Sequence, residues 1–171
     1  MFLSALERNA SFVQRHIDEY MSEWSTSSLT DAMKYALSGG KRLRAYLVVQ
    51  SACLFGIPLE QSIWPACGIE AIHAYSLVHD DLPSMDNDDM RRGKQTVHKK
   101  WDDATAILTG DALQSLGFEL VLNEACSSDA FVRAQLALKL SQAAGGEGMV
   151  LGQAMDIAAE KSLLDLSLDQ I

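Results

Sequence analysis

The part of the chain best suited to chemistry is an acidic segment that leads directly into a basic one. Five aspartates fall within ten residues and five cations within the next ten, at Asp80, Asp81, Asp86, Asp88, Asp89, Arg91, Arg92, Lys94, Lys99 and Lys100. Crowded carboxylates repel one another unless a cation neutralises them, and hard oxygen ligands with an open side suit Mg²⁺, which also takes phosphate oxygens. The adjacent arginines offer forked donors for phosphate. The segment therefore predicts a site that holds a phosphorylated substrate through bridging magnesium.

A histidine and an aspartate are expected on one face of the helix before this segment. Each helical residue advances about 100°, so His73 and Asp80, seven positions apart, differ by only about 20°. Asp80 and Asp81 come at the helix C-terminus, where the negative end of the macrodipole disfavours carboxylates, and a bound cation would remove that penalty. A solvated polar helix end is the alternative. An EF-hand loop beginning at Asp86 is excluded, because Arg91 stands where that loop requires glycine.

Two further segments carry polar groups suited to a diphosphate ligand. The sequence GGKRLR at 39–44 is a glycine turn that runs into a helix start, where backbone N–H groups together with Lys41 and Arg44 can hold phosphate oxygens. A helix cap with solvated charges is the alternative, and a Walker loop is excluded because its spacer is missing. Gln153 and Asp156, three apart on a predicted helix, fit either a binding surface or an exposed helix edge.

Helical periodicity dominates the rest of the chain. Apolar residues recur at three- and four-residue intervals, which predicts helices over 3–21, 29–37, 43–54, 66–82, 103–125, 131–143 and 149–159. Strand-like alternation is absent, and glycine or proline marks most helix ends. The predicted fold class is all-α, with antiparallel helices around a central active-site cavity, and Asp111 is expected to be a buried structural acid. The long polar connection 83–97 is expected to be functional.

Composition bounds the broad class of the protein. A chain of 171 residues with 48% hydrophobic content is expected to form one domain with a real core, and its net charge of −9 argues against nucleic-acid binding. The longest apolar stretch, 45–58, is too short to span a bilayer, and the N-terminus lacks the apolar region of a secretory signal. Three widely spaced cysteines are expected to be buried thiols in a reducing cytosol. The sequence therefore predicts a soluble, cytoplasmic protein that is not an integral membrane protein.

Four segments together resemble the trans-isoprenyl diphosphate synthase family. They are GGKRLR (39–44), EAIHAYSLVHDDLPSMDNDDMRRGKQTVH (70–98), AILTGDALQ (106–114) and GQAMD (152–156). Their order and spacing are similar to the family pattern, and the first aspartate-rich motif has its longer form, DDxxxxD. The resemblance covers essentially the whole chain and is greatest to the bacterial farnesyl diphosphate synthase branch, also called geranyltranstransferases. It implies an isoprenoid synthase fold.

The resemblance implies a role for each matching residue. Asp80, Asp81 and Asp86 would bind Mg²⁺ bridging the diphosphate of the allylic substrate, with Asp80 and Asp86 the strongest ligand candidates. Arg91 would contact the allylic diphosphate. The isopentenyl diphosphate pocket would consist of Lys41, Arg44, His73 and Arg92, and the allylic side would be lined by Gln153 and Asp156.

The implied reaction is a head-to-tail condensation. Isopentenyl diphosphate would add to dimethylallyl or geranyl diphosphate and give farnesyl diphosphate, with Asp80, Asp81, Asp86 and Arg91 as the catalytic set. Tyr75, five residues before Asp80, would floor the product cavity and favour farnesyl over geranylgeranyl diphosphate, although an ordinary core tyrosine is the alternative. A geranylgeranyl diphosphate synthase, a non-catalytic homologue that binds diphosphates and a terpene cyclase are the competing functions. The family also implies a homodimer.

Two departures from the family pattern affect these expectations. Ala45 stands where the family usually has proline after GGKRLR. The second aspartate-rich motif and a later lysine–threonine segment are absent from the sequence, and its last residues, KSLLDLSLDQI, begin another helical pattern. Residues 1–171 are therefore expected to be the N-terminal portion of a single isoprenyl synthase domain, and the chain alone is expected to be inactive or barely active.

Overall fold

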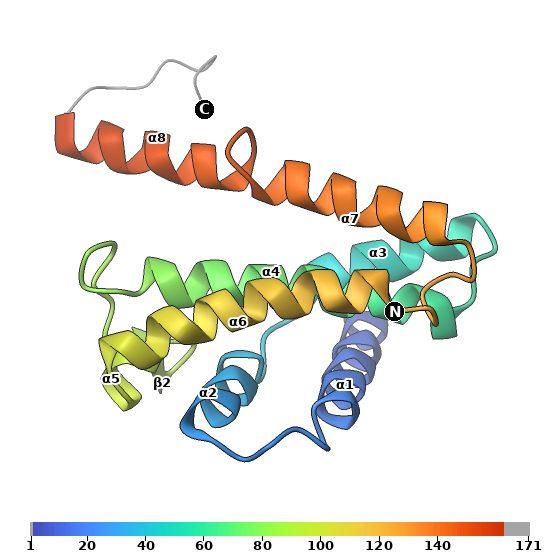
Figure 1. Ribbon diagram of the computed structural model, residues 1–171, viewed down its shortest axis with the longest axis horizontal. Coiled ribbons are helices and arrows are strands. Elements are labelled where there is room, and N and C mark those ends of the chain that lie inside the picture. Colours follow the sequence, from blue (N-terminus) through green and yellow to red (C-terminus); the bar gives the residue numbers. More distant parts are fainter. Residues whose placement is uncertain (1, 163–171) are drawn as a thin grey trace.

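The computed structural model describes residues 2–162, and helices form most of it (Figure 1). The elements are α1 (Phe2–Tyr20), α2 (Ser28–Ala36), α3 (Leu43–Leu54), α4 (Leu59–Asp80), β1 (Met90–Arg91), β2 (Lys94–Gln95), α5 (Val97–Lys100), α6 (Asp103–Leu122), α7 (Ala130–Ala144) and α8 (Met149–Ser162). The all-α expectation is confirmed, apart from one very short antiparallel hairpin in which Met90 pairs with Gln95. None of the helices in the described range is both long and apolar enough to cross a membrane.

The helix boundaries follow the predicted ones with two informative exceptions. The helix predicted for 66–82 begins earlier, at Leu59. Pro65 therefore lies inside α4, although proline usually interrupts a helix. The connection 83–97 contains the β1–β2 hairpin, which is too short to show any periodicity. At the other end of α6, the helix stops at Leu122 because Asn123 has an extended backbone.

A tightly packed pair of helices, α4 and α6, forms the centre of the molecule. Figure 1 shows α1 and α2 on one side of this pair and α7 and α8, nearly end to end, on the other. Glycines allow the close approach. A Cβ added to Gly68 would lie 2.8 Å from the carbonyl oxygen of Gly117, and one added to Gly117 would lie 2.7 Å from the Ile72 side chain. Further along, the His79 ring occupies the space beside Gly110.

The hydrophobic core joins the α4–α6 pair to α1 and α2. Its fully buried side chains include Val13, Ile17, Met21, Met33, Leu37, Leu113, Leu116 and Leu120. Cys67 belongs to this core, and burial raises the pKa of its thiol to about 12, so it is an inert thiol. The expectation of buried cysteines holds for Cys67 and Cys126 but is wrong for Cys53, which is exposed.

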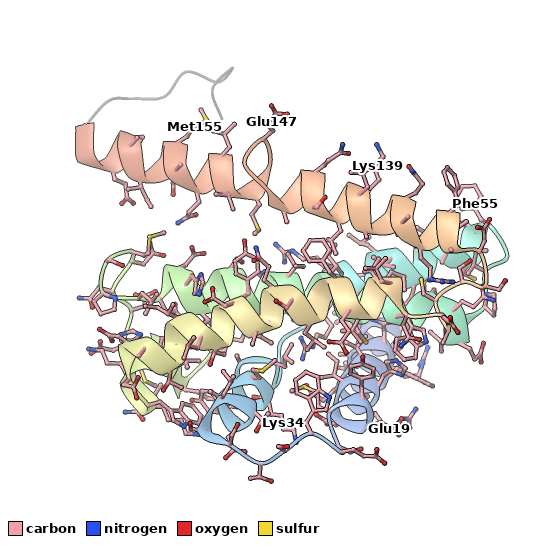
Figure 2. All side chains as sticks on the ribbon, in the orientation of Figure 1. Glu19, Lys34, Phe55, Lys139, Glu147 and Met155 are labelled. Carbon is pink, nitrogen blue, oxygen red and sulfur yellow. The ribbon has the colours of Figure 1, made fainter. Side chains whose placement is uncertain are left out.

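The opposite side of the α4–α6 pair is more open. A cavity of about 700 Å³ lies between α3, α4 and α7, with mainly aliphatic walls. A second cavity, of about 350 Å³, lies between α4 and α8. Figure 2 shows the labelled side chains of Phe55 and Glu147 pointing away from the helix pair, and Phe55 is 84% exposed. The helices thus surround open space beside α4, as the fold prediction required.

The close contact between α4 and α6 generates a stability prediction. Gly68→Ala would push a methyl group against the backbone of Gly117, so the helices must separate and the free energy of unfolding should fall by about 1–3 kcal/mol. Gly152→Ala, in α8, is the matched control, because nothing lies within 4 Å of its added Cβ and alanine is the better helix former. Urea denaturation of both variants checks this. Equal midpoints for the two variants would contradict the packing argument.

Candidate active site

The acidic segment begins at the C-terminal end of α4, where two adjacent aspartates have different environments. Asp81 is only 3% exposed, and its carboxylate accepts hydrogen bonds from Arg91. The Nε–Oδ1 distance is 2.7 Å and the Nη2–Oδ1 distance is 2.6 Å. This forked ion pair raises the pKa of Arg91 above its usual value, chiefly through the hydrogen bond that Arg91 donates to Asp81. Asp81 is therefore an internal partner of Arg91.

Asp80 and Asp86 form the more open part of the acidic segment. The Asp86 backbone N–H donates to the carbonyl oxygen of Asp80 at 2.9 Å, so the loop folds back over the helix end. Burial raises the pKa of Asp80, and the charge of Asp86 adds to that shift while Arg91 opposes it. Asp86 itself is exposed. A cation placed between these carboxylates would relieve their repulsion, and the donor set of hard oxygens suits Mg²⁺.

The predicted three-aspartate ligand set is not assembled in this structure. Within residues 2–162 no group of three or more histidine, cysteine or acidic side chains converges on a metal position. The role of Asp81 as a metal ligand stays a prediction, and in this structure its buried carboxylate is engaged by Arg91. Asp80 and Asp86 remain the candidate ligands. Sequence spacing could not distinguish the environments of Asp80 and Asp81, because Arg91, the partner of Asp81, lies ten residues further along the chain.

The glycine turn and α4 bring a second group of predicted residues together. Arg44, on the first turn of α3, has its Nη1 3.3 Å from Nε2 of His73 on α4. The pKa of His73 is lowered to about 4, chiefly by burial and then by the charge of Arg44, with smaller contributions from Arg92 and Arg42, while Glu70 opposes the shift. The imidazole is therefore neutral near pH 7. Lys41 lies in the same turn and is exposed.

Arg92 reaches the glycine turn from the hairpin. A Cβ on Gly40 would lie 2.5 Å from Nη1 of Arg92, so the guanidinium rests where any larger residue would place its side chain. Partial burial lowers the pKa of Arg92, and the neighbouring arginines act in the same direction, while Glu70 opposes them. Arg44, His73 and Arg92 thus form a cationic group with unbalanced positive charge, which suits an anionic ligand.

A small cavity of about 150 Å³ connects the cationic group to the acidic segment. Its walls include Gly39, Gly40, Leu77, Asp81, Arg91 and Arg92. Arg91 and Arg92 therefore line the same cavity as Asp81 and the glycine turn. The structure thus places parts of the predicted segments around one cavity, although Lys41, Arg44, His73, Asp80 and Asp86 do not line it.

The cavity of about 350 Å³ between α4 and α8 contains the predicted product-length residue. Tyr75 is 7% exposed, its ring stands edge-on to His79 at a centroid distance of 5.7 Å, and it lines the 350 Å³ cavity together with Asp80 and Gln153. Burial raises the pKa of the Tyr75 phenol. Asp156 is exposed and does not line this cavity, so the structure separates the predicted Gln153–Asp156 pair.

Several residues that shape the site were missed by sequence reasoning. On α8 the cavity is lined by Met149, Val150, Ala154 and Ile157, whose i, i+4, i+7 spacing could have indicated an inward face. His79 also lines it and packs against Gly110. The expectation for Asp111 was wrong, because that side chain is exposed on the outer face of α6.

The hairpin that carries Arg91 and Arg92 is fastened to α2. The Tyr35 hydroxyl donates to the carbonyl oxygen of Gln95 at 2.7 Å, and Lys100 Nζ lies 3.8 Å from the centre of the Tyr35 ring. Lys94 Nζ donates to the Ser38 hydroxyl at 3.1 Å. These contacts join residues 56 to 65 positions apart, so no local pattern could have predicted them.

Comparisons with known proteins agree with this geometry. Residues 26–170 match the family model described as polyprenyl synthetase. The chain is 44% identical over 162 residues to farnesyl diphosphate synthase of Haemophilus influenzae, covering 91% of this chain and 55% of that protein. It is 41% identical over 175 residues to heterodimeric geranylgeranyl pyrophosphate synthase large subunit 1 of Arabidopsis thaliana, covering 99% of this chain and 47% of that protein.

A solved structure shows the same fold. The apo crystal structure of an FPP/GFPP synthase from Zymomonas mobilis matches with a TM-score of 0.93 and 46% sequence identity, over 98% of this chain and 61% of that one. The chain spans about half the length of the curated relatives that it matches. With the family model covering most of the sequence and the fold agreeing at this identity, the chain belongs to the polyprenyl synthetase family.

Proposed function

We propose that this chain supplies the substrate-binding residues of a magnesium-dependent prenyltransferase. The reaction would condense isopentenyl diphosphate head-to-tail with dimethylallyl or geranyl diphosphate to give farnesyl diphosphate. The observation that carries the proposal is a small cavity lined by the glycine turn, Asp81, Arg91 and Arg92, next to the mutually repelling carboxylates of Asp80 and Asp86. A relative that is 44% identical is named farnesyl diphosphate synthase. In this proposal residues 1–171 correspond to about half of one isoprenyl synthase domain.

The two substrates would use different residues. Lys41, Arg44, His73 and Arg92 would bind isopentenyl diphosphate, because Arg44 contacts the neutral His73 and Arg92 reaches Gly40 in the turn that carries Lys41. Arg91, oriented by Asp81, would donate to the allylic diphosphate. Asp80 and Asp86 would hold magnesium, and Gln153 would line the allylic side. Bound magnesium supplies the charge that stabilises the departing diphosphate. The apolar side chains of α8 that line the cavity with Tyr75 would exclude water from the reactive carbon chain.

Tyr75 supports farnesyl diphosphate as the product. Its buried ring narrows the cavity that begins at Asp80, so a growing chain would meet the phenol. The second candidate product is geranylgeranyl diphosphate, since one relative is named a geranylgeranyl pyrophosphate synthase subunit. A non-catalytic, diphosphate-binding homologue is less well supported, because Asp80, Asp86 and Arg91 are all retained.

The proposal extends to assembly and location. Ile107, Leu108 and Leu122 leave α6 with exposed apolar side chains, between 46% and 55% accessible. Such a surface supports a homodimer that would cover part of α6. A cytoplasmic location agrees with the absence of any disulfide among the described cysteines. Each of these statements stands as part of the proposal.

The first test concerns magnesium and the allylic substrate. Calorimetry should detect binding of a non-reactive geranyl diphosphate analogue only when Mg²⁺ is present. Asp80→Asn or Asp86→Asn should weaken this binding by about 10- to 100-fold, since a contact to a charged group is worth roughly 1.5–3 kcal/mol. Asp89→Asn is the matched control, because it removes one charge from the same segment but that carboxylate pairs with Lys99 at 2.9 Å. Magnesium-independent binding in the unmodified chain would rule out the proposed role.

The second test uses the depressed pKa of His73. The unfolded imidazole titrates near 6.5 and the folded one near 4, so between these values the unfolded state binds more protons and stability must rise with pH. On acidification from pH 7 towards pH 4, the unmodified chain should therefore lose more stability than His73→Gln. Saturating isopentenyl diphosphate should reduce the difference, because its negative charge favours the imidazolium. Denaturation curves at several pH values measure this, and parallel pH profiles for the two proteins would contradict it.

The third test concerns product length. Tyr75→Ala should enlarge the cavity between α4 and α8 and raise the affinity for a geranylgeranyl diphosphate analogue relative to a farnesyl one. Burial of additional methylene groups contributes about 0.8 kcal/mol each, so a several-fold change in the affinity ratio is expected. Tyr75→Phe retains the ring and should leave the ratio unchanged. Competition binding measures the ratio, and an equal ratio in all three proteins would make Tyr75 an ordinary core residue.

A further inference from the structure

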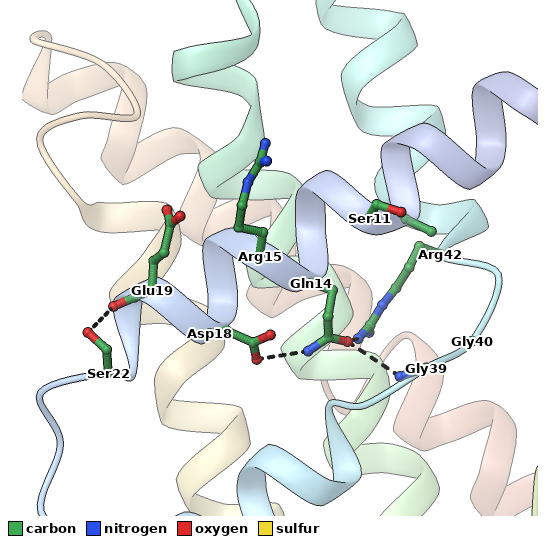
Figure 3. A pocket seen from close by; sticks show the side chains of 10 residues that line it. Ser11, Gln14, Arg15, Asp18, Glu19, Ser22, Gly39, Gly40 and Arg42 are labelled. Atoms are coloured by element: carbon green, nitrogen blue, oxygen red, sulfur yellow. Dashed lines mark hydrogen bonds between the residues drawn. The ribbon is translucent and has the colours of Figure 1, made fainter.

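Arg42 lies in the glycine turn, and its side chain points toward Gln14 of α1 (Figure 3). It is only 5% exposed. Its Nη1 lies 3.2 Å from Oε2 of Glu70, and Nη2 donates to the side-chain oxygen of Gln14 at 3.0 Å and to the carbonyl oxygen of Leu37. The guanidinium is thus held by α4, α1 and the end of α2 at once, and is not free to contact a diphosphate.

Glu70 uses its second carboxylate oxygen to cap another helix. Oε1 accepts from the backbone N–H of Ala45 at 3.0 Å. The residue at the N-cap of α3 is Arg42, which has no side-chain oxygen to accept this hydrogen bond and makes no side-chain cap. Glu70, itself 3% exposed, therefore provides from α4 the acceptor that an N-cap side chain normally provides. A proline at position 45 could not donate to it, so Ala45 makes this bond possible.

The backbone of the turn requires this support. Arg42 has φ 53°, and Gly39 and Gly40 have φ 78° and 85°. The left-handed conformation costs a non-glycine residue roughly 1–2 kcal/mol, and it persists when surrounding contacts hold it. Gln14 adds to the support, since its side-chain oxygen also accepts from the N–H of Gly39 at 3.4 Å. Figure 3 shows Gln14 between Arg42, Gly39 and Asp18.

The location of Glu70 links this support to the isopentenyl diphosphate residues of the proposed function. His73 is one helical turn further along α4, and Arg44 is two residues beyond Arg42 at the start of α3. A carboxylate that fixes both Arg42 and the N-terminus of α3 therefore sets where Arg44 stands relative to His73, now 3.3 Å away. We propose that Glu70 is a positioning residue that, through Arg42 and Ala45, holds Lys41 and Arg44 in register with His73 to receive isopentenyl diphosphate. This inference rests on the proposed function.

The experiment compares isopentenyl diphosphate affinity with stability in the full chain. Glu70→Gln keeps the size of the side chain but leaves the Arg42 charge buried and unpaired, so affinity should fall at least about tenfold and the unfolding midpoint should fall as well. The double variant Arg42→Met/Glu70→Met removes both charges, and replacing a buried ion pair with apolar groups of similar volume is often neutral for stability. Its midpoint should therefore recover in part, since the N–H of Ala45 still loses its acceptor, while its affinity stays at least about tenfold weaker. Glu60→Gln, exposed in the first turn of α4, is the control and should match the unmodified chain in both measurements.

The outcomes separate this inference from the proposed function. Recovery of both stability and affinity in the double variant would show that the pair is only structural and would overturn the inference. Unchanged affinity in Glu70→Gln, measured at a temperature where the protein is folded, would overturn it without need of the double variant. If the unmodified chain itself fails to bind isopentenyl diphosphate, the proposed function falls and this inference falls with it.

Discussion

The close contact between α4 and α6 is the constraint on which the candidate site depends. Five groups of the site lie on α4 or at its C-cap, so the position of this one helix sets their positions: Glu70, His73, Tyr75, Asp80 and Asp81. Glycines at the crossing bring backbone against backbone, which leaves little freedom for α4 to rotate or slide. On a helix held this firmly, a polar side chain keeps its orientation even where it has few partners. A site built on rigid elements also has a more precise geometry than one built on loops.

Two internal ion pairs divide the charged residues into those that support the site and those that are left for ligands. Glu70 takes Arg42 and Asp81 takes Arg91, each with its carboxylate almost fully buried. Buried ion pairs are weak contributors to net stability, because desolvation offsets their attraction. In this structure they orient the chain instead. The Glu70–Arg42 pair fixes the glycine turn, and the Asp81–Arg91 pair fixes the hairpin, both beside α4. A protein with a net charge of −9 can in this way present a local surface of positive charge to an anion.

Sequence reasoning predicted the helices and the location of the site more successfully than it predicted the directions of side chains. Helix α3 spans the predicted 43–54, and the acidic segment does follow α4. Spacing along one helix, however, carries no information about partners contributed by other elements. Asp81 looked like a ligand residue in its motif but turns inward to a donor that only the fold supplies. Arg42, for which the sequence predicted no role, turns inward to Glu70. The hairpin was missed for a different reason: its strands have two residues each, which is too short to show a periodic pattern.

The turn of that hairpin explains how adjacent arginines can have different tasks. Arg92 and Gly93 connect β1 to β2 and both have positive φ, 52° and 76°, which is the requirement of a two-residue type I′ turn. Asparagine followed by glycine is the usual choice there, so arginine accepts a conformational cost of about 1–2 kcal/mol at this position. The left-handed backbone separates the two side chains: Arg91 turns back to Asp81, while Arg92 reaches across to Gly40. Because Gly40 has no side chain and Arg92 occupies that space, the turn and the glycine segment depend on each other. The same pair of contacts therefore places Asp81, at the end of α4, and the glycine turn before α3 around one cavity.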